Sequence, residues 1–76
     1  MELRIRTFGK LAEHAGGELL IPAVPDTRML KAALEALHPV FRDVPFRIAV
    51  NRRLVDGDVP LSPSDEIAVL PPFSGG

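Results

Sequence analysis

The chain has 76 residues, of which 46% are hydrophobic and 25% charged, with a net charge of −1 and no cysteine. These values are typical of one small globular domain and exclude a disulfide framework or a thiolate metal site. They give no electrostatic reason to expect nucleic acid or a membrane as a partner. No apolar run is long enough to span a bilayer and the N-terminus is not a signal peptide, so we expect a cytoplasmic protein.

The N-terminal region predicts two antiparallel strands. In residues 2–8 polar and apolar side chains alternate, which indicates a half-buried strand with Leu3 and Ile5 facing the core. Phe8 then falls on the opposite face of that strand. The following connection has room for a short helical turn, and residues 18–21 form the second strand.

One amphipathic helix is predicted from Thr27 to His38. Asp26 and Thr27 are both good N-cap residues. Apolar side chains recur at positions i, i+3, i+4 and i+7 and form one stripe of Leu30, Ala33, Leu34 and Leu37. Pro39 ends the helix because the residue before a proline avoids the α conformation. A single stripe on a single helix needs a sheet to cover it.

The C-terminal half predicts three more strands after an irregular stretch at 40–45. They cover residues 46–50, 54–55 and 66–70, and turn-forming residues separate them. One helix crossing one face of a mixed sheet of about five strands is an α+β fold, the β-grasp or ubiquitin-like roll. We expect this domain to occupy residues 1–70 and an extended Gly-Gly tail to follow at 71–76.

The tail reads Pro-Pro-Phe-Ser-Gly-Gly. Its prolines hold φ at about −65° and direct the chain away from the domain. Gly75 and Gly76 carry no side chain that would obstruct a narrow active site, and a terminal glycine carboxylate can be activated as an adenylate. Chain ends also carry Gly and Ser without function. This tail directly follows an apolar strand, which favours the functional interpretation.

No residue pattern predicts catalysis by the chain itself. The glutamates are scattered, and none pairs with His14 or His38 at a spacing that suits acid–base chemistry. The two histidines lie far apart in sequence, so we expect no zinc site. The serines lack a nucleophile-elbow context, and no phosphate-binding loop is present. We therefore expect no bound metal or cofactor.

A docking surface is predicted on the sheet face away from the helix. Strand alternation places an apolar cluster there, formed by Phe8, Ala49, Ala68 and Leu70 with Leu54 at its rim. A contiguous apolar cluster beside a projecting tail suggests a protein partner. The alternative is that part of this cluster packs beneath loops.

The C-terminal third of the chain resembles a known family. Residues 49–55 read Ala-Val-Asn-Arg-Arg-Leu-Val, Pro60-Leu61 precede a turn, and residues 64–76 read Ser-Asp-Glu-Ile-Ala-Val-Leu-Pro-Pro-Phe-Ser-Gly-Gly. This pattern resembles the small subunit of molybdopterin synthase, which reads VN-x-x-LV, PL before a turn, GDE, an apolar strand and PP-x-SGG. Two positions depart from it. Ser64 replaces the glycine of GDE, and Ala12 stands where relatives often have an arginine.

The resemblance implies a sulfur carrier. In that family the terminal carboxylate, here Gly76 next to Gly75, is adenylated by an E1-like enzyme with ATP and converted into a thiocarboxylate. The charged tail then enters the large subunit of molybdopterin synthase, in a heterotetramer, and gives its sulfur to a pyranopterin. The carrier supplies no acid or base of its own. The partner-binding residues that the resemblance implies are Phe8, Leu54, Leu70, Pro71, Pro72, Phe73 and Ser74.

Three alternatives stay open. Sulfur carriers for thiamine, cysteine or tRNA thiolation share the fold and the Gly-Gly end, although thiamine carriers tend to be shorter and lack the Pro-Pro pair. A ubiquitin-like modifier would be joined through Gly76 to lysines of other proteins. A plain β-grasp interaction domain would be indifferent to the loss of Gly76.

Overall fold

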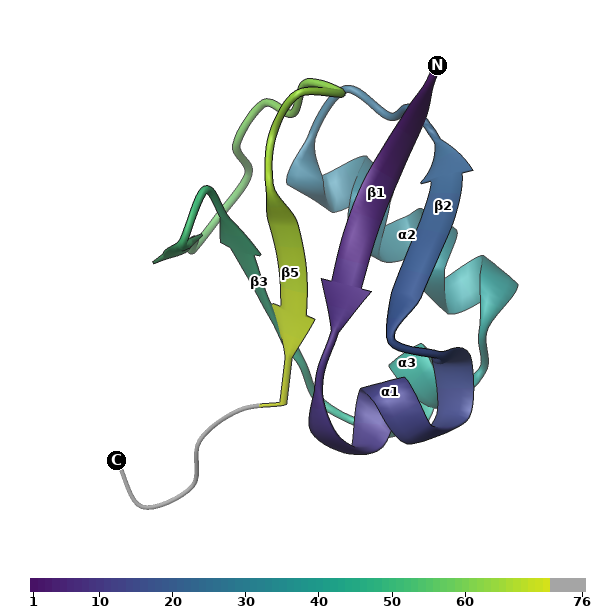
Figure 1. Ribbon diagram of the computed structural model, residues 1–76. Coiled ribbons are helices and arrows are strands. Elements are labelled where there is room, and N and C mark those ends of the chain that lie inside the picture. The colour runs from purple at the N-terminus through teal and green to yellow at the C-terminus, as the bar shows by residue number, and fades with distance from the viewer. Residues whose placement is uncertain (72–76) are drawn as a thin grey trace.

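The computed structural model describes residues 1–71 of the chain, which form one mixed sheet with helices (Figure 1). The elements are β1 (Glu2–Thr7), α1 (Gly9–Ala15), β2 (Glu18–Pro22), α2 (Thr27–Leu37), α3 (Val40–Asp43), β3 (Arg47–Val50), β4 (Arg53–Leu54) and β5 (Ile67–Leu70). The helix α2 crosses behind the sheet in Figure 1. This is the β-grasp arrangement that the sequence predicted. Within this described part, no helix is long and apolar enough to cross a membrane.

The strand order is β2-β1-β5-β3-β4. The strand β1 pairs antiparallel with β2 and parallel with β5, so the first and last strands of the chain lie side by side at the centre of the sheet. The strand β3 pairs antiparallel with both β5 and β4. The predicted strands are therefore confirmed, with ends that differ by one or two residues.

The core lies between the sheet and α2. Strand β1 alternates strictly between exposed and buried residues, and the side chains that it buries are Leu3, Ile5 and Thr7. Other buried core residues come from β2, α2 and β5, namely Leu19, Ile21, Leu30, Leu34, Ile67 and Val69. The helix stripe is confirmed in part. Leu30 and Leu34 are buried and Ala33 is half-buried, but Leu37 is 53% exposed at the end of α2.

Two helical segments are more extensive than predicted. The stretch at 40–43, which we expected to be irregular, forms α3, and the expected short turn after β1 is the seven-residue helix α1. Phe41 in α3 is 2% exposed, and its ring packs edge-on against Phe46 at 5.3 Å between centroids. Leu11 in α1 is fully buried. Each helix is thus stabilised by one buried anchor, a tertiary contact that local periodicity does not reveal.

The start of α2 is fixed by both of the predicted capping residues, but only Asp26 is the cap. The Asp26 carboxylate accepts a hydrogen bond from Met29 N at 2.9 Å. Thr27 is the first helical residue, is 4% exposed, and its hydroxyl accepts a bond from Val59 N at 3.0 Å. Thr27 therefore ties the long connection between β4 and β5 to α2, a role that its capping propensity did not predict.

Candidate functional site

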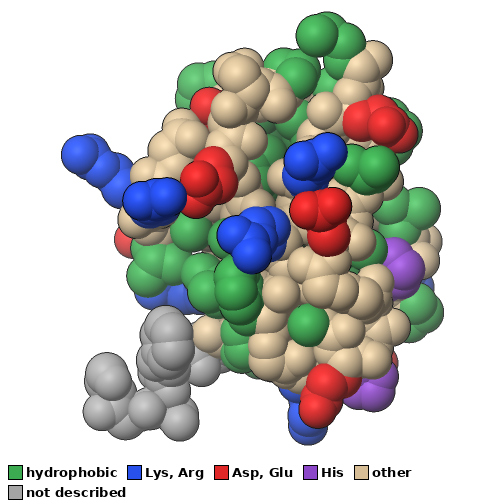
Figure 2. All heavy atoms as spheres, in the orientation of Figure 1, with side chains coloured by type: hydrophobic (Ala, Val, Ile, Leu, Met, Phe, Trp, Pro, Cys, Tyr) green, Lys and Arg blue, Asp and Glu red, His purple; other side chains and the backbone are tan. Residues whose placement is uncertain are grey.

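A shallow apolar hollow lies on the sheet face away from α2. It has a volume of about 270 Å³ and is lined by Phe8, Ala49, Arg52, Leu54, Glu66, Ala68 and Leu70. Figure 2 shows apolar side chains gathered on this face at the lower left, close to where the described chain ends. The predicted cluster of five apolar residues is therefore one continuous surface in the folded chain. We call these five residues, Phe8, Ala49, Leu54, Ala68 and Leu70, the docking face.

Strand register explains the hollow. Ala68 of β5 lies between Arg6 of β1 and Ala49 of β3, and Ala49 in turn faces Leu54 of β4. The two alanines form a low floor, and Ala49 is 7% exposed rather than open to solvent as its outward position suggested. The side chains of Phe8 and Leu54 rise above this floor and are 41% and 48% exposed. Such a shape can accommodate a protruding apolar side chain of a partner.

A rigid hairpin forms one side of the hollow. Asn51 and Arg52 have φ of 52° and 69°, a pair of left-handed residues that makes the tight turn between β3 and β4. The Asn51 side chain accepts a hydrogen bond from Glu66 N at 2.9 Å and donates one to Asp65 Oδ1 at 3.1 Å. Arg52 Nε lies 3.3 Å from Glu66 Oε2. These contacts fix the turn to the start of β5, and they place a paired charge at the rim.

The beginning of the tail packs against the beginning of α1. Gly9 has φ of +60°, and a Cβ added to it would lie 2.9 Å from Cγ of Pro71. Gly9 follows Phe8, whose extended backbone precedes α1 as its N-cap position. The close approach positions the exit of the chain next to Phe8 and Leu70. Sequence reasoning did not identify Gly9, although a glycine at a strand–helix junction is a signal for such an approach.

The predicted site residues fall into two groups, those that the structure describes and those that it does not. Phe8, Leu54 and Leu70 are brought together, and Pro71 is half-buried beside them. Pro72, Phe73, Ser74, Gly75 and Gly76 lie outside the described residues, so their roles stay predictions. Over residues 1–71, no group of three or more His, Asp or Glu side chains is placed to hold a metal ion.

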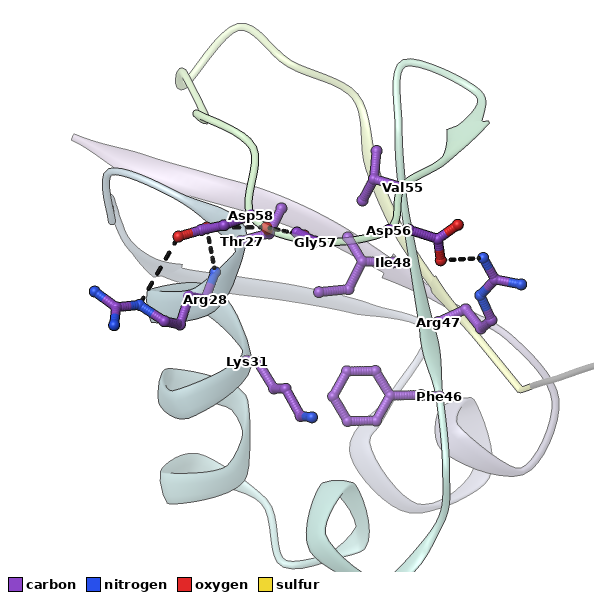
Figure 3. A pocket seen from close by; sticks show the side chains of 10 residues that line it. All are labelled: Thr27, Arg28, Lys31, Phe46, Arg47, Ile48, Val55, Asp56, Gly57 and Asp58. Atoms are coloured by element: carbon purple, nitrogen blue, oxygen red, sulfur yellow. Dashed lines mark hydrogen bonds and ion pairs between the residues drawn. The ribbon is translucent and has the colours of Figure 1, made fainter.

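A larger hollow of about 450 Å³ lies between α2, β3 and the segment 55–58 (Figure 3). Four of its five charged residues form two ion pairs, Arg47 Nη2 with Asp56 Oδ1 at 2.9 Å and Arg28 Nε with Asp58 Oδ2 at 3.8 Å. The fifth, Lys31, is in no ion pair among residues 1–71. Asp58 also accepts a bond from Arg28 N at 3.1 Å. The hydroxyl of Thr27 also lies 3.3 Å from Asp58 Oδ1. These contacts hold the segment 55–58 against α2 and β3, so the paired residues have a structural role.

Comparisons with known proteins confirm the fold. The ThiS family matches residues 5–76. A Pyrococcus furiosus protein assigned as molybdopterin converting factor, subunit 1, is 26% identical, with a TM-score of 0.82 over 96% of this chain and 99% of its own. A chain from the Helicobacter pylori complex of subunits 1 and 2 of molybdopterin-converting factor is 32% identical, with a TM-score of 0.71 and full coverage of both chains. SAMP1 from Haloferax volcanii, 24% identical, shares the fold with a TM-score of 0.77 and full coverage of both chains.

Proposed function

Because this chain belongs to the ThiS family of ubiquitin-like sulfur carriers, we propose that it is the sulfur-carrying small subunit of a molybdopterin synthase. The observation that carries the proposal is the position of the docking face. Its apolar hollow adjoins the end of β5, where Pro71 leads into the Gly-Gly tail. A partner that covers this hollow is therefore next to the tail.

The proposed chemistry resides at the terminal carboxylate. An oxygen of Gly76 attacks the α-phosphorus of ATP on an E1-like enzyme, and pyrophosphate leaves. A sulfur donor then displaces AMP from the mixed anhydride and leaves a thiocarboxylate. Covalent activation divides a difficult substitution into two easier steps, and the enzymes supply the acids and bases. The carrier binds its partner enzymes, extends its tail into their active sites and delivers sulfur to the pyranopterin.

The length of the tail suits this delivery. Six extended residues span at most about 20 Å, which is enough to pass from a partner's surface into its active site. We propose that Pro72, Phe73 and Ser74 contact the channel of the large subunit and that Gly75 leaves room at its end. The Helicobacter relative comes from a complex of subunits 1 and 2, which supports a large-subunit partner. By that analogy we propose a heterotetramer of two carriers and two large subunits.

Intact-mass measurement tests the first step. The full chain is incubated with the E1-like enzyme of the same genome, ATP and a sulfur donor, and we expect a mass gain equal to the exchange of one oxygen for one sulfur. The matched control is the chain without Gly76, which should keep its thermal stability and gain no sulfur. An unchanged mass of the full chain, with an enzyme that forms the adenylate of other carriers, would contradict the proposal.

The second step decides the pathway. The thiocarboxylated chain and the large subunit should convert the cyclic pyranopterin precursor into molybdopterin. Sulfur transfer to an activated serine or homoserine with a cysteine-synthase-like partner, and never to the pterin, would instead establish the alternative carrier role. Conjugates of this chain with lysines of other proteins in extracts would establish the modifier role.

A further inference from the structure

Among residues 1–71, Arg6 is the arginine on the docking side of the sheet whose guanidinium lies within ion-pair distance of no carboxylate. It lies in β1 with its side chain exposed, and no ion pair or hydrogen bond of its guanidinium occurs among residues 1–71. Arg4, two residues earlier on the same face, lies 3.8 Å from Glu18, and Arg52 is paired with Glu66. Arg53 pairs in register with the inward-facing Val50, so it belongs to the other side of the sheet.

The position of Arg6 relates it directly to the hollow. Its guanidinium carbon lies over the Phe8 ring, 5.9 Å from the ring centroid. In register it is the neighbour of Ala68, which forms part of the floor, and of Glu18 in β2, whose carboxylate lies near Arg4 and not near Arg6. The cation–π contact restricts the side chain to the edge of the hollow without neutralising its charge. A carboxylate brought to this point would meet a pre-positioned planar donor that can bind both of its oxygens.

From this geometry we infer that Arg6 is a specificity-determining residue of the docking face. It selects a partner surface that places a carboxylate beside the apolar side chain that fills the hollow. The partner is the E1-like adenylating enzyme, because every use of the terminal glycine requires that enzyme to receive the tail first. The inference rests on the proposed function for its partner and leaves the final sulfur acceptor open.

The test measures the dissociation constant of the full chain for the adenylating enzyme of the same genome by titration calorimetry. Neutralising Arg6→Gln should weaken binding by about three- to tenfold at 0.1 M salt, the range expected for a partly desolvated surface charge. The difference should become smaller at 1 M salt without vanishing, because a partly desolvated contact pair is screened less than an exposed one. Arg6→Lys, which keeps the charge without the planar donor, should recover part of the loss.

Two matched variants separate the possible outcomes. The double variant Arg4→Gln, Glu18→Gln removes the neighbouring pair from the same face without freeing a carboxylate opposite Arg6, and we expect binding within about twofold of the unaltered chain, as for a screened surface pair. Leu70→Ala removes an apolar wall of the hollow and should weaken binding at both salt concentrations. The altered arginines are exposed and Leu70 is half-buried, and thermal unfolding should confirm that every variant folds.

The inference is overturned if Leu70→Ala weakens binding while Arg6→Gln does not, or if the double variant Arg4→Gln, Glu18→Gln weakens binding as much as Arg6→Gln. In those cases the proposed function stands. If binding depends on Arg6 as expected but the thiocarboxylated chain never yields molybdopterin, the inference stands and the proposed pathway fails. If the unaltered chain neither binds the enzyme nor gains sulfur, both are wrong.

Discussion

Replacing Gly9 by alanine is expected to destabilise the domain for two separable reasons. The first is backbone strain, since φ at Gly9 is +60° and a side chain in this left-handed region costs about 1–2 kcal/mol. The second is contact, because the new Cβ would lie 2.9 Å from Cγ of Pro71, well inside the ordinary carbon–carbon separation of about 3.5–4.0 Å. Relieving such an overlap by shifting neighbours typically costs about 1–3 kcal/mol.

Two other glycines provide matched controls. Gly57 has φ of +76° but no atom within 4 Å of an added Cβ, so Gly57→Ala should show the strain alone. Gly17 has neither a left-handed φ nor a close neighbour, and Gly17→Ala should be neutral or stabilise by up to about 1 kcal/mol through the unfolded chain. We therefore expect losses of about 2–5 kcal/mol for Gly9→Ala and about 1–2 kcal/mol for Gly57→Ala.

Urea unfolding followed by circular dichroism measures these free energies, with the midpoint compared at constant slope. Pro71→Ala removes the ring carbons that the new Cβ would approach, so combining it with Gly9→Ala should restore the contact part of the loss. If Gly9→Ala costs no more than Gly57→Ala, or if Pro71→Ala restores nothing, then the approach of Pro71 to α1 does not constrain the exit of the tail and the reasoning is refuted.

The remaining predictions concern single positions. Ile67→Arg should unfold the domain because Ile67 is 1% exposed and the charge would be buried unpaired. Leu70→Arg should keep the circular dichroism spectrum of the unaltered chain and weaken partner binding by about 2 kcal/mol or more. Equal unfolding of both variants would refute the assignment of the two residues to opposite faces of the sheet. Phe41→Ala should cost about 3–5 kcal/mol in urea unfolding, and a loss below 1 kcal/mol would show that α3 is not anchored by this ring. Thr27→Val keeps the side-chain volume but removes the hydroxyl bonded to Val59 N, so the free energy of unfolding should fall by about 1–3 kcal/mol. The Val59 amide should also exchange faster with deuterium. An unchanged exchange rate would show that the Thr27 hydroxyl does not hold the β4–β5 connection against α2.

Local patterns in the sequence determined the elements and their faces. Alternation in β1 and β5 placed Leu3, Ile5 and Ile67 in the core, because successive side chains of a strand must point to opposite faces. The same rule placed Phe8 and Leu70 on the open face, and the structure brings them together in one hollow. The Gly-Gly ending and its family pattern are likewise properties of the sequence alone.

Only the tertiary structure decided what depends on contacts between distant segments. Whether Asp26 or Thr27 caps α2 was open locally, and the burial of Thr27 against Val59 decided it. The helix α3 is stabilised by the packing of Phe41 against Phe46. A side chain at position 9 is disfavoured because Pro71, 62 positions later, packs against Gly9. Arg6 stands out in the same way. Only the assembled sheet shows which arginines have a carboxylate within reach, since pairing depends on which strands become neighbours and on how exposed side chains then turn. Glu18 lies opposite Arg6 in register, yet its carboxylate lies 3.8 Å from Arg4.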